Sequence, residues 1–307
     1  MLSCTSCTAT RSCLNRGVRI CLMLEGQEGI EWEQWLAHAR AAEAAGLEGL
    51  FRSDHYQSIG RGSPAGSLDA WTVLAALAAH TERIRLGTMV SPVTFRPASV
   101  LAKSVATVDH ISNGRVELGI GAGWYEVEHL TYGFPFLTTG ERLDELDRQL
   151  AEIERQWTTA EDIWPKPLQQ PRPPIIVGGS AKPRTVHTAI RFADEYNTPF
   201  PTVDEARERK QAVDAAARKA GRPPLRFSIM IGCLVGRDEA EVGERLTAYR
   251  AATGRDDRPP VTGTVDQVVE QLRAYEAAGV ERALLQHLVH EDVEMVTVLG
   301  DVAAQLH

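Results

Sequence analysis

Short apolar runs alternate with amphipathic segments along the chain from residue 18 onward. Each run is followed by a segment whose apolar positions recur every three or four residues, which is the pattern of a strand followed by a helix. The expected strands lie at 18–24, 50–54, 84–90, 116–121, 175–178, 194–198, 227–235 and 283–288. Eight strand–helix units predict an α/β fold of the closed (β/α)8 barrel type.

The expected helices share an apolar stripe and lie at 32–45, 69–79, 97–111, 183–192, 204–220 and 239–251, with a last helix after residue 288. Two helix ends have similar sequences, at 41–48 and 275–281, where Gly46 and Gly279 can make the left-handed turn into a strand. Two doubly wound domains would show the same alternation, but no linker rich in Gly, Ser or charge divides the chain. We therefore expect one barrel domain over residues 18–307.

The longest irregular region, 124–174, lies between strands four and five and is expected to be an insertion in the barrel. Thr138 and Glu141 form a capping-box pattern that predicts the start of a helix. The apolar stripe of that helix is spaced for a core contact and consists of Leu143, Leu146, Leu150 and Ile153. Proline-rich sequence at 164–174 then predicts an extended chain that leads into strand five.

Composition and charge narrow the class of partner. The chain has 307 residues, 43% of them hydrophobic, and a formal net charge of −8, which favours a small-molecule partner over nucleic acid or an anionic membrane surface. No apolar run approaches the roughly 20 residues of a membrane span, and the first twenty residues lack the apolar centre of a signal peptide. We expect a cytoplasmic protein.

Three of the five cysteines, Cys4, Cys7 and Cys13, crowd into a Ser- and Thr-rich leader. A structural metal site would need a fourth ligand and a second cluster, whereas Cys21 lies in an apolar run and Cys233 is far away. We therefore predict no metal site, a disordered extension over residues 1–17, and burial of Cys21 and Cys233.

Residues that follow the barrel strands carry the candidate chemistry, because the C-terminal ends of the strands meet at one mouth. Four segments qualify, at 53–56, 88–92, 121–124 and 178–180. In the first, His55 beside Asp54 is either a proton donor or part of a hydrogen-bonded structural pair.

A second candidate is the strand-to-helix turn formed by Gly178, Gly179 and Ser180. Free backbone N–H groups and the helix dipole make such a turn a phosphate site, with Lys182 or Arg184 able to assist. A Gly-Gly turn can also serve only to pack a helix closely against its strand.

The glycine-rich stretch at 119–123 resembles a dinucleotide-binding loop but lacks its spacing. The fingerprint G-x-G-x-x-G needs a glycine three residues after Gly121, whereas Gly123 and then Trp124 follow. Alternating glycines instead remove side chains from one face of the strand end, which would allow a flat ring system to lie there.

The ordered string of motifs from residue 86 to residue 125 resembles the bacterial luciferase-like monooxygenase superfamily, and most closely its branch of oxidoreductases that use the deazaflavin coenzyme F420. The motifs are LGTMV at 86–90, RPA at 96–98, LAK at 101–103, ATVD at 106–109, SNGR at 112–115 and GIGAGWY at 119–125. The resemblance covers nearly the whole chain from Gly17 onward.

The resemblance implies a luciferase-like (β/α)8 barrel with the deazaflavin ring in its mouth. Asp54 and His55 match the family's Asp-His at the end of strand two, where the His contacts the ring and is a candidate proton donor. Met89 and Val90 fall where the family often has a non-proline cis peptide behind the ring. The cofactor-binding positions implied in this way are Thr88, Met89, Val90, Gly121, Gly123, Trp124, Gly178, Gly179 and Ser180.

Three features depart from the family pattern, and one is the cysteine-rich leader, which has no counterpart in the family. A hairpin-like insertion that helps to cover the substrate side in the family is missing before the segment at 164–167. Arg52 lies on the same strand face as Asp54, and since an unpaired buried charge is costly, we expect it to pair with Asp54 or with Glu25.

The first functional hypothesis is an oxidoreductase that transfers a hydride between coenzyme F420 and a small organic substrate, with His55 handling the proton. The alternatives are an FMN-dependent two-component monooxygenase that uses reduced flavin and oxygen, and a barrel that binds a ligand without catalysis. Segments 56–67 and 132–136 are expected to form an apolar substrate wall. The family resemblance also implies a homodimer.

Overall fold

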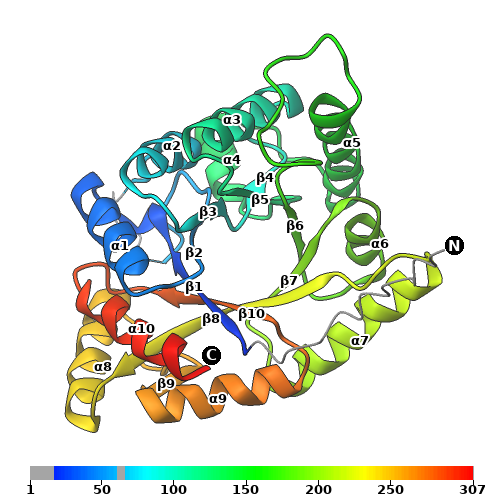
Figure 1. Cartoon of the computed structure of the whole chain (residues 1–307). Coiled ribbons are helices and arrows are strands. Elements are labelled where there is room, and N and C mark those ends of the chain that lie inside the picture. Colours follow the sequence, from blue (N-terminus) through cyan, green and yellow to red (C-terminus); the bar gives the residue numbers. More distant parts are fainter. Residues whose placement is uncertain (1–16, 61–65, 307) are drawn as a thin grey trace, which may run out of the picture.

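Eight of the apolar runs form parallel strands that pair side by side in a closed ring. The protein is represented by a computed structural model, which describes residues 17–60 and 66–306. Around the ring the order is β1, β2, β3, β5, β6, β7, β8 and β10, and β10 pairs with both β8 and β1. The predicted (β/α)8 barrel is confirmed (Figure 1).

The ring strands agree with the expected runs to within two residues at each end. They are β1 (Arg19–Leu24), β2 (Gly49–Arg52), β3 (Arg85–Thr88), β5 (Val116–Gly121), β6 (Ile175–Gly178), β7 (Glu195–Pro199), β8 (Arg226–Gly236) and β10 (Arg282–His287). Two short strands outside the ring were not expected. They are β4 (Ser91–Pro92), which pairs in parallel with β5, and β9 (Val261–Thr264), which pairs in parallel with β8.

Helices cover the outside of the ring (Figure 1). They are α1 (Trp32–Ala44), α2 (Ala70–His80), α3 (Ala98–Ile111), α6 (Pro183–Phe192), α7 (Val203–Lys219), α8 (Glu239–Thr253), α9 (Val265–Ala277) and α10 (Glu294–Leu306). The glycines at the two similar helix ends have the expected left-handed backbone, with φ of 74° at Gly46 and 93° at Gly279. Among the described residues, no helix is long and apolar enough to cross a lipid bilayer.

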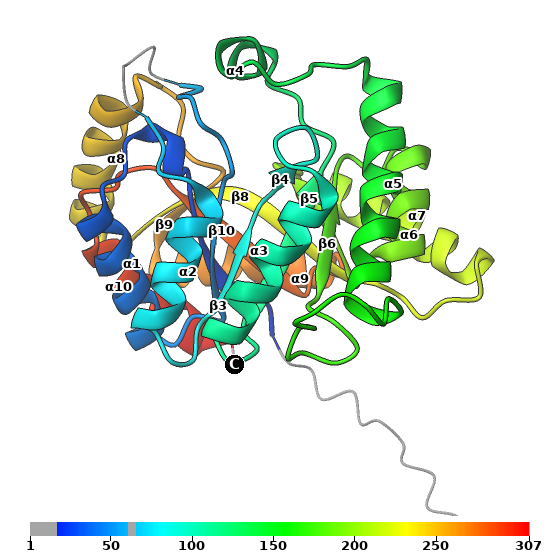
Figure 2. The same ribbon diagram turned by 90° about the horizontal axis from the view of Figure 1, so that it is seen from above.

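The insertion between β5 and β6 contains two helices, α4 (Glu126–Tyr132) and α5 (Thr139–Thr158). The predicted capping box is present, since Thr138 N donates to Glu141 Oε2 (2.9 Å) and Glu141 N donates to Thr138 Oγ1 (3.3 Å). The stripe packs as expected, with Leu146, Leu150 and Ile153 buried and Leu143 partly buried. Helix α4 stands apart at one end of the barrel, and the C-terminus lies at the other (Figure 2).

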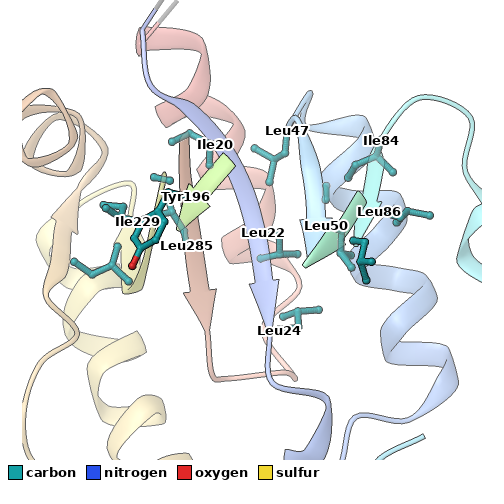
Figure 3. Close-up of a cluster of buried hydrophobic side chains, with 14 of the residues drawn as sticks. Ile20, Leu22, Leu24, Leu47, Leu50, Ile84, Leu86, Tyr196, Ile229 and Leu285 are labelled. Atoms are coloured by element: carbon teal, nitrogen blue, oxygen red, sulfur yellow. The ribbon is translucent and has the colours of Figure 1, made fainter. Parts of the chain in front are cut away.

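Alternate side chains of each strand face the helices or the barrel interior. The outward set belongs to the main core and includes Ile20, Leu22 and Leu24 of β1, with Leu50, Leu86, Ile229 and Leu285 on other strands (Figure 3). The inward set forms a separate cluster of Cys21, Met23, Phe51, Met89, Ile176 and Leu284. These inward side chains therefore fill the interior of the barrel below its mouth.

Charged side chains close the floor of the barrel, where the strands begin. Arg282 is fully buried and pairs with Glu117 (2.7 Å) and Glu195 (2.6 Å), and Arg85 also pairs with Glu117. Burial alone would raise the pKa of Glu117, but the charges and hydrogen bonds of Arg282 and Arg85 lower that pKa to about 2. Two carboxylates thus share one buried guanidinium.

Two of the five cysteines lie among the residues that the structure describes. Cys21 and Cys233 are buried and free, as expected, and burial raises the pKa of both thiols. The leader cysteines lie outside the described residues, as does the predicted extension over 1–17 except for Gly17, which is buried against Leu306. No group of His, Cys, Asp or Glu in the described ranges is arranged to hold a metal ion.

Candidate functional site

A cavity of about 600 Å³ opens at the C-terminal ends of the barrel strands. Its location agrees with the rule that barrel active sites form from the loops after the strands. Of the predicted site residues, those that line it are His55, Met89, Val90, Gly121, Gly123, Trp124, Gly178 and Gly179. The structure therefore brings together residues from four separate strand ends.

His55 forms its closest polar contact with a carboxylate that was not predicted. Its Nδ1 lies 2.6 Å from Oε1 of Glu128 on α4, and Oε2 of Glu128 accepts the backbone N–H of Tyr56 at 3.0 Å. Glu128 is fully buried. Burial lowers the pKa of His55, but the hydrogen bond and charge of Glu128 outweigh it, so that the pKa of His55 is raised above its ordinary value.

Asp54 does not line the cavity, although its neighbour does. It is 1% exposed, and Arg96 Nη1 donates to its Oδ2 over 2.6 Å while Ser91 Oγ donates to the same oxygen over 2.7 Å. The idea that Asp54 pairs with His55 is therefore corrected, because Asp54 is committed to Arg96 and the carboxylate bonded to His55 is that of Glu128.

Two further predicted residues lie outside the cavity lining. Thr88 is fully buried, and its Oγ1 donates to the carbonyl oxygen of Gly119 (2.7 Å), which ties β3 to β5. A Cβ on Gly119 would collide with the Thr88 carbonyl oxygen, so this strand pair needs glycine there. Ser180 is exposed at the start of the turn that precedes α6.

The glycines at the end of β5 allow the segment after β3 to pack closely against that strand. A Cβ on Gly121 would lie 2.7 Å from Val90 Cγ2, and Gly123 has a left-handed φ of 78°. The Met89–Val90 peptide is cis, as the resemblance implied. One wall of the cavity therefore consists of Met89, Val90 and exposed backbone.

The turn after β6 is only partly free to bind an anion. The N–H of Ala181 donates to the Tyr196 hydroxyl (2.9 Å), and Gly179 N donates to Asn197 O (2.9 Å). Arg184 forms an ion pair with Asp144 of α5, so its charge is not available to the turn alone. Lys182 is exposed.

Arg52 does not have the partner that its position suggested. Its guanidinium carbon lies 4.6 Å from the centroid of the Trp35 ring, and Nη2 donates to the Leu68 carbonyl (2.9 Å). Among the described residues no carboxylate forms an ion pair with Arg52, so the expected pairing with Asp54 or Glu25 is wrong. Burial lowers the pKa of Arg52 to about 10.

The rim of the cavity contains exposed apolar side chains, of which Trp124 was predicted, Ile59 lies in the expected wall segment 56–67, and Phe200 was missed. Ile59, Trp124 and Phe200 line the cavity and are 38%, 61% and 51% exposed. Phe200 has φ of 46°, a conformation that is uncommon for an aromatic residue. Segment 132–136 does not contribute to the lining as expected, because Phe134 instead stacks on Phe95 with ring centroids 4.7 Å apart.

The cavity also has a polar side that was missed, next to the 3-10 helix η1 (Gly26–Glu28). Glu25 Oε2 accepts from Gln27 (2.8 Å) and Oε1 from Gln286 (2.5 Å). Glu28 accepts from the Ser58 hydroxyl (2.7 Å). The acidic sequence after strand one was the available signal, since it follows a strand end like the segments that were chosen.

The family model described as luciferase-like monooxygenase matches residues 20–261, which is more than half of the chain. The chain belongs to the luciferase-like monooxygenase family. The string of motifs at 86–125 lies within this match. The family comprises oxidoreductases and monooxygenases, so an enzymatic role is supported.

Curated relatives of this luciferase-like chain use two kinds of coenzyme. An uncharacterized protein of Mycobacterium tuberculosis is 37% identical over 175 residues, which cover 52% of this chain and 60% of that protein, so the chain spans about 60% of that relative. The F420-dependent hydroxymycolic acid dehydrogenase of the same organism is 28% identical over 93% of this chain and 79% of its own length. The FMNH(2)-dependent dimethylsulfone monooxygenase of Pseudomonas putida is 26% identical over 68% and 60%.

Solved structures share the luciferase-like barrel. The coenzyme F420-dependent tetrahydromethanopterin reductase of Methanopyrus kandleri has a TM-score of 0.78 at 18% identity, covering 95% of this chain and 100% of that chain. A monooxygenase of Streptomyces bottropensis has a TM-score of 0.76 at 21% identity, covering 94% and 99%. At these identities the similarity confirms the fold.

Proposed function

We propose that this protein is an oxidoreductase that transfers a hydride between coenzyme F420 and a small organic substrate. The proposal is supported by the F420-dependent hydroxymycolic acid dehydrogenase, whose similarity extends over 93% of this chain. An F420-dependent glucose-6-phosphate dehydrogenase of Microbacterium testaceum is also 29% identical over 82% of the chain. The observation that carries the proposal is a protonatable His55 in the wall of a cavity that also has a face cleared of side chains.

The residues present fit a planar ring system. Gly121 leaves no room for a Cβ beside Val90, so backbone and the flat side of Val90 form one continuous face. Met89 and Val90 would support the ring from behind, and the Gly178–Gly179 turn before α6 would hold the phosphate. When bound, the deazaflavin supplies a ring carbon that gives or accepts a hydride.

His55 would manage the proton that accompanies the hydride. Its pKa is raised by Glu128, so the ring carries a proton over more of the neutral pH range than an isolated histidine does. The apolar lining, which includes Met230, Pro92 and Leu288, favours a substrate with an apolar body and excludes water from the reacting groups.

Titration of the purified protein with F420 and with FMN tests the proposal. We expect F420 to bind at least about tenfold more tightly than FMN, which is about 1.4 kcal/mol in binding free energy. Steady-state reduction of F420 with a panel of small primary and secondary alcohols then tests hydride transfer. Failure of F420 to bind would refute the proposal.

A second candidate function is an FMN-dependent monooxygenase that receives reduced flavin from a separate reductase. It is supported by the dimethylsulfone monooxygenase, which is 26% identical over 68% of this chain. The same titration separates the two, because this candidate requires reduced FMN to bind more tightly than F420. Oxygen consumption that depends on reduced FMN and on an added substrate would favour it.

A further inference from the structure

We infer that Glu128 is a positioning residue that accepts the Nδ1–H of His55 and thereby presents Nε2 to the cavity as the atom that takes up and releases the titrating proton. The geometry of the Glu128–His55 pair carries this inference. The catalytic importance of Nε2 rests on the proposed function, whereas the pairing itself does not.

The carboxylate of Glu128 accepts a hydrogen bond on one oxygen and meets His55 with the other. Its Oε2 accepts the Tyr56 N–H, which is an obligatory donor, and its Oε1 lies 2.6 Å from His55 Nδ1. The hydrogen of the second contact is placed on Nδ1, which is the arrangement in which imidazole donates to a carboxylate. In the neutral ring the lone pair is then on Nε2, and no described residue forms a hydrogen bond with that nitrogen.

Helix α4, which holds Glu128, is hydrogen-bonded to the segment that contains His55. The Tyr132 hydroxyl donates to the Tyr56 carbonyl (3.1 Å), which complements the bond from the Tyr56 N–H to Glu128. His129 anchors the next position of α4, with Nε2 2.7 Å from Thr94 Oγ1. Contacts on both sides of Glu128 therefore hold its carboxylate against His55.

Aromatic neighbours fix the plane of the His55 ring. The rings of Trp124 and Tyr125 meet it edge to face, at centroid distances of 5.9 and 6.2 Å and an interplanar angle of 80° in both pairs. With Nδ1 bonded to Glu128, the ring cannot rotate without breaking that bond. The orientation of Nε2 is therefore determined by three neighbours from the segment that follows β5.

Two further carboxylates near His55 have other partners. Asp54 forms an ion pair with Arg96, whereas Glu25 keeps its charge and accepts hydrogen bonds from Gln27 and Gln286. Glu25 and Asp54 raise the pKa of His55, but less than the direct bond and charge of Glu128 do. Removing the charge of Glu128 should therefore have the largest effect on the titration of His55.

The test is an NMR titration of the full-length protein labelled with ¹⁵N and ¹³C in its histidines, with the His55 signal assigned by its loss in His55→Asn. We expect the wild-type ring to be protonated on Nδ1 when neutral, and Glu128→Gln to lower the pKa of His55 by about one. The matched control is Glu126→Gln, which removes an exposed carboxylate from the same helix and should leave the pKa unchanged.

Two results would overturn the inference: a neutral wild-type ring protonated on Nε2, or a pKa of His55 that does not change in Glu128→Gln. The tautomer measurement needs no variant and remains decisive if Glu128→Gln does not fold. Glu128→Asp should restore part of the raised pKa, which a purely structural role would not require. Neither readout requires coenzyme, so failure of F420 to bind would refute the proposed function and leave this inference standing.

Discussion

Arg96 bridges Asp54 and Asp69, with Nη1 2.6 Å from Asp54 Oδ2 and Nη2 bonded to Asp69 Oδ2. Asp69 is the N-cap residue of α2, where its side chain accepts the Thr72 N–H. The guanidinium therefore joins the end of β2 to the start of the following helix. Asp54 belongs to this support, while the adjacent His55 faces the cavity.

Replacing Asp54 should consequently affect stability more than chemistry. We expect Asp54→Asn to lower the free energy of unfolding by about 2 kcal/mol, because a buried charge-assisted hydrogen bond is weakened. Turnover of the folded enzyme with saturating coenzyme should stay within about twofold of wild type. Urea denaturation and steady-state kinetics check the two parts, and a large loss of turnover with unchanged stability would reassign Asp54 to proton transfer.

Replacing His55 should affect turnover more than stability. Loss of a general acid or base typically costs about 10²-fold or more in rate, so we expect His55→Asn to reduce turnover by about that factor. Coenzyme affinity, measured by titration, should change little because the asparagine preserves most of the wall. His187→Asn, on the exposed face of α6, is the control. Unchanged turnover in His55→Asn would remove His55 from the mechanism.

The wall beside Gly121 offers a test of the coenzyme site. In Gly121→Ala the new Cβ would meet Val90 Cγ2 at 2.7 Å and push that side chain into the cavity. We expect about tenfold weaker binding of the coenzyme, with a melting temperature close to that of wild type. Gly140→Ala is the matched control, because no atom lies within 4 Å of its added Cβ. Equal affinity in both variants would place the ring elsewhere.

The floor of the barrel predicts a large stability effect. The substitution Arg282→Met removes the guanidinium that Glu117 and Glu195 share. The two carboxylates are only 1% and 2% exposed, so they stay buried without that partner. Breaking a buried ion pair from one side costs about 3–5 kcal/mol, and we expect a loss of that size in urea denaturation at neutral pH. Arg226→Met is the control, since Arg226 is partly exposed and lies 3.5 Å from Glu195, and its loss should be much smaller.

Acid should destabilise the protein through His287, which is buried at the end of β10 and hydrogen-bonded to the Asp292 carbonyl. Burial, with a smaller contribution from nearby His38, lowers the pKa of His287 to about 3. The unfolded chain binds the proton near its ordinary pKa of about 6.5, whereas the native state does not. Stability is therefore lost as the pH falls from about 6.5 toward 3.

Between about pH 6.5 and pH 4.5 this contribution amounts to about 2 kcal/mol. His287→Gln keeps a side-chain donor and removes the titration, so its unfolding free energy should fall less over that range than that of wild type. His187→Gln, which alters an exposed histidine, should follow the wild-type curve. Parallel curves for all three proteins would contradict the prediction.

The ring strands and most helices could be predicted because burial imposes a period on their sequences. Strand β9 (VTGT) could not, since among the described strands it pairs only with the far end of β8, and three of its four residues are glycine or threonine and form no apolar pattern. The start of α9 was also missed, although Val268, Val269, Leu272 and Tyr275 form a buried stripe at helical spacing and its glycine end was recognised. A short edge strand such as β9 has no such stripe for periodicity to detect.

The partner of His55 could not be read from the sequence. Glu126 and Glu128 are two residues apart in WYEVEH, and only the docking of α4 buries the second and exposes the first. Glu128 is also 73 residues from His55 along the chain. Arg52 was misjudged for a related reason, because strand alternation gives the face of a residue but not the Trp35 ring that covers it.

The exposed apolar rim has a consequence for how this chain and its relatives diverge. Ile59, Trp124 and Phe200 lie in segments that follow β2, β5 and β7, and none of them belongs to the ring or to the charged floor. Exchanges at these positions leave strand pairing intact, so selection can change the molecules admitted to the mouth while the barrel is inherited unaltered. New substrates can thus be acquired through single substitutions at the rim.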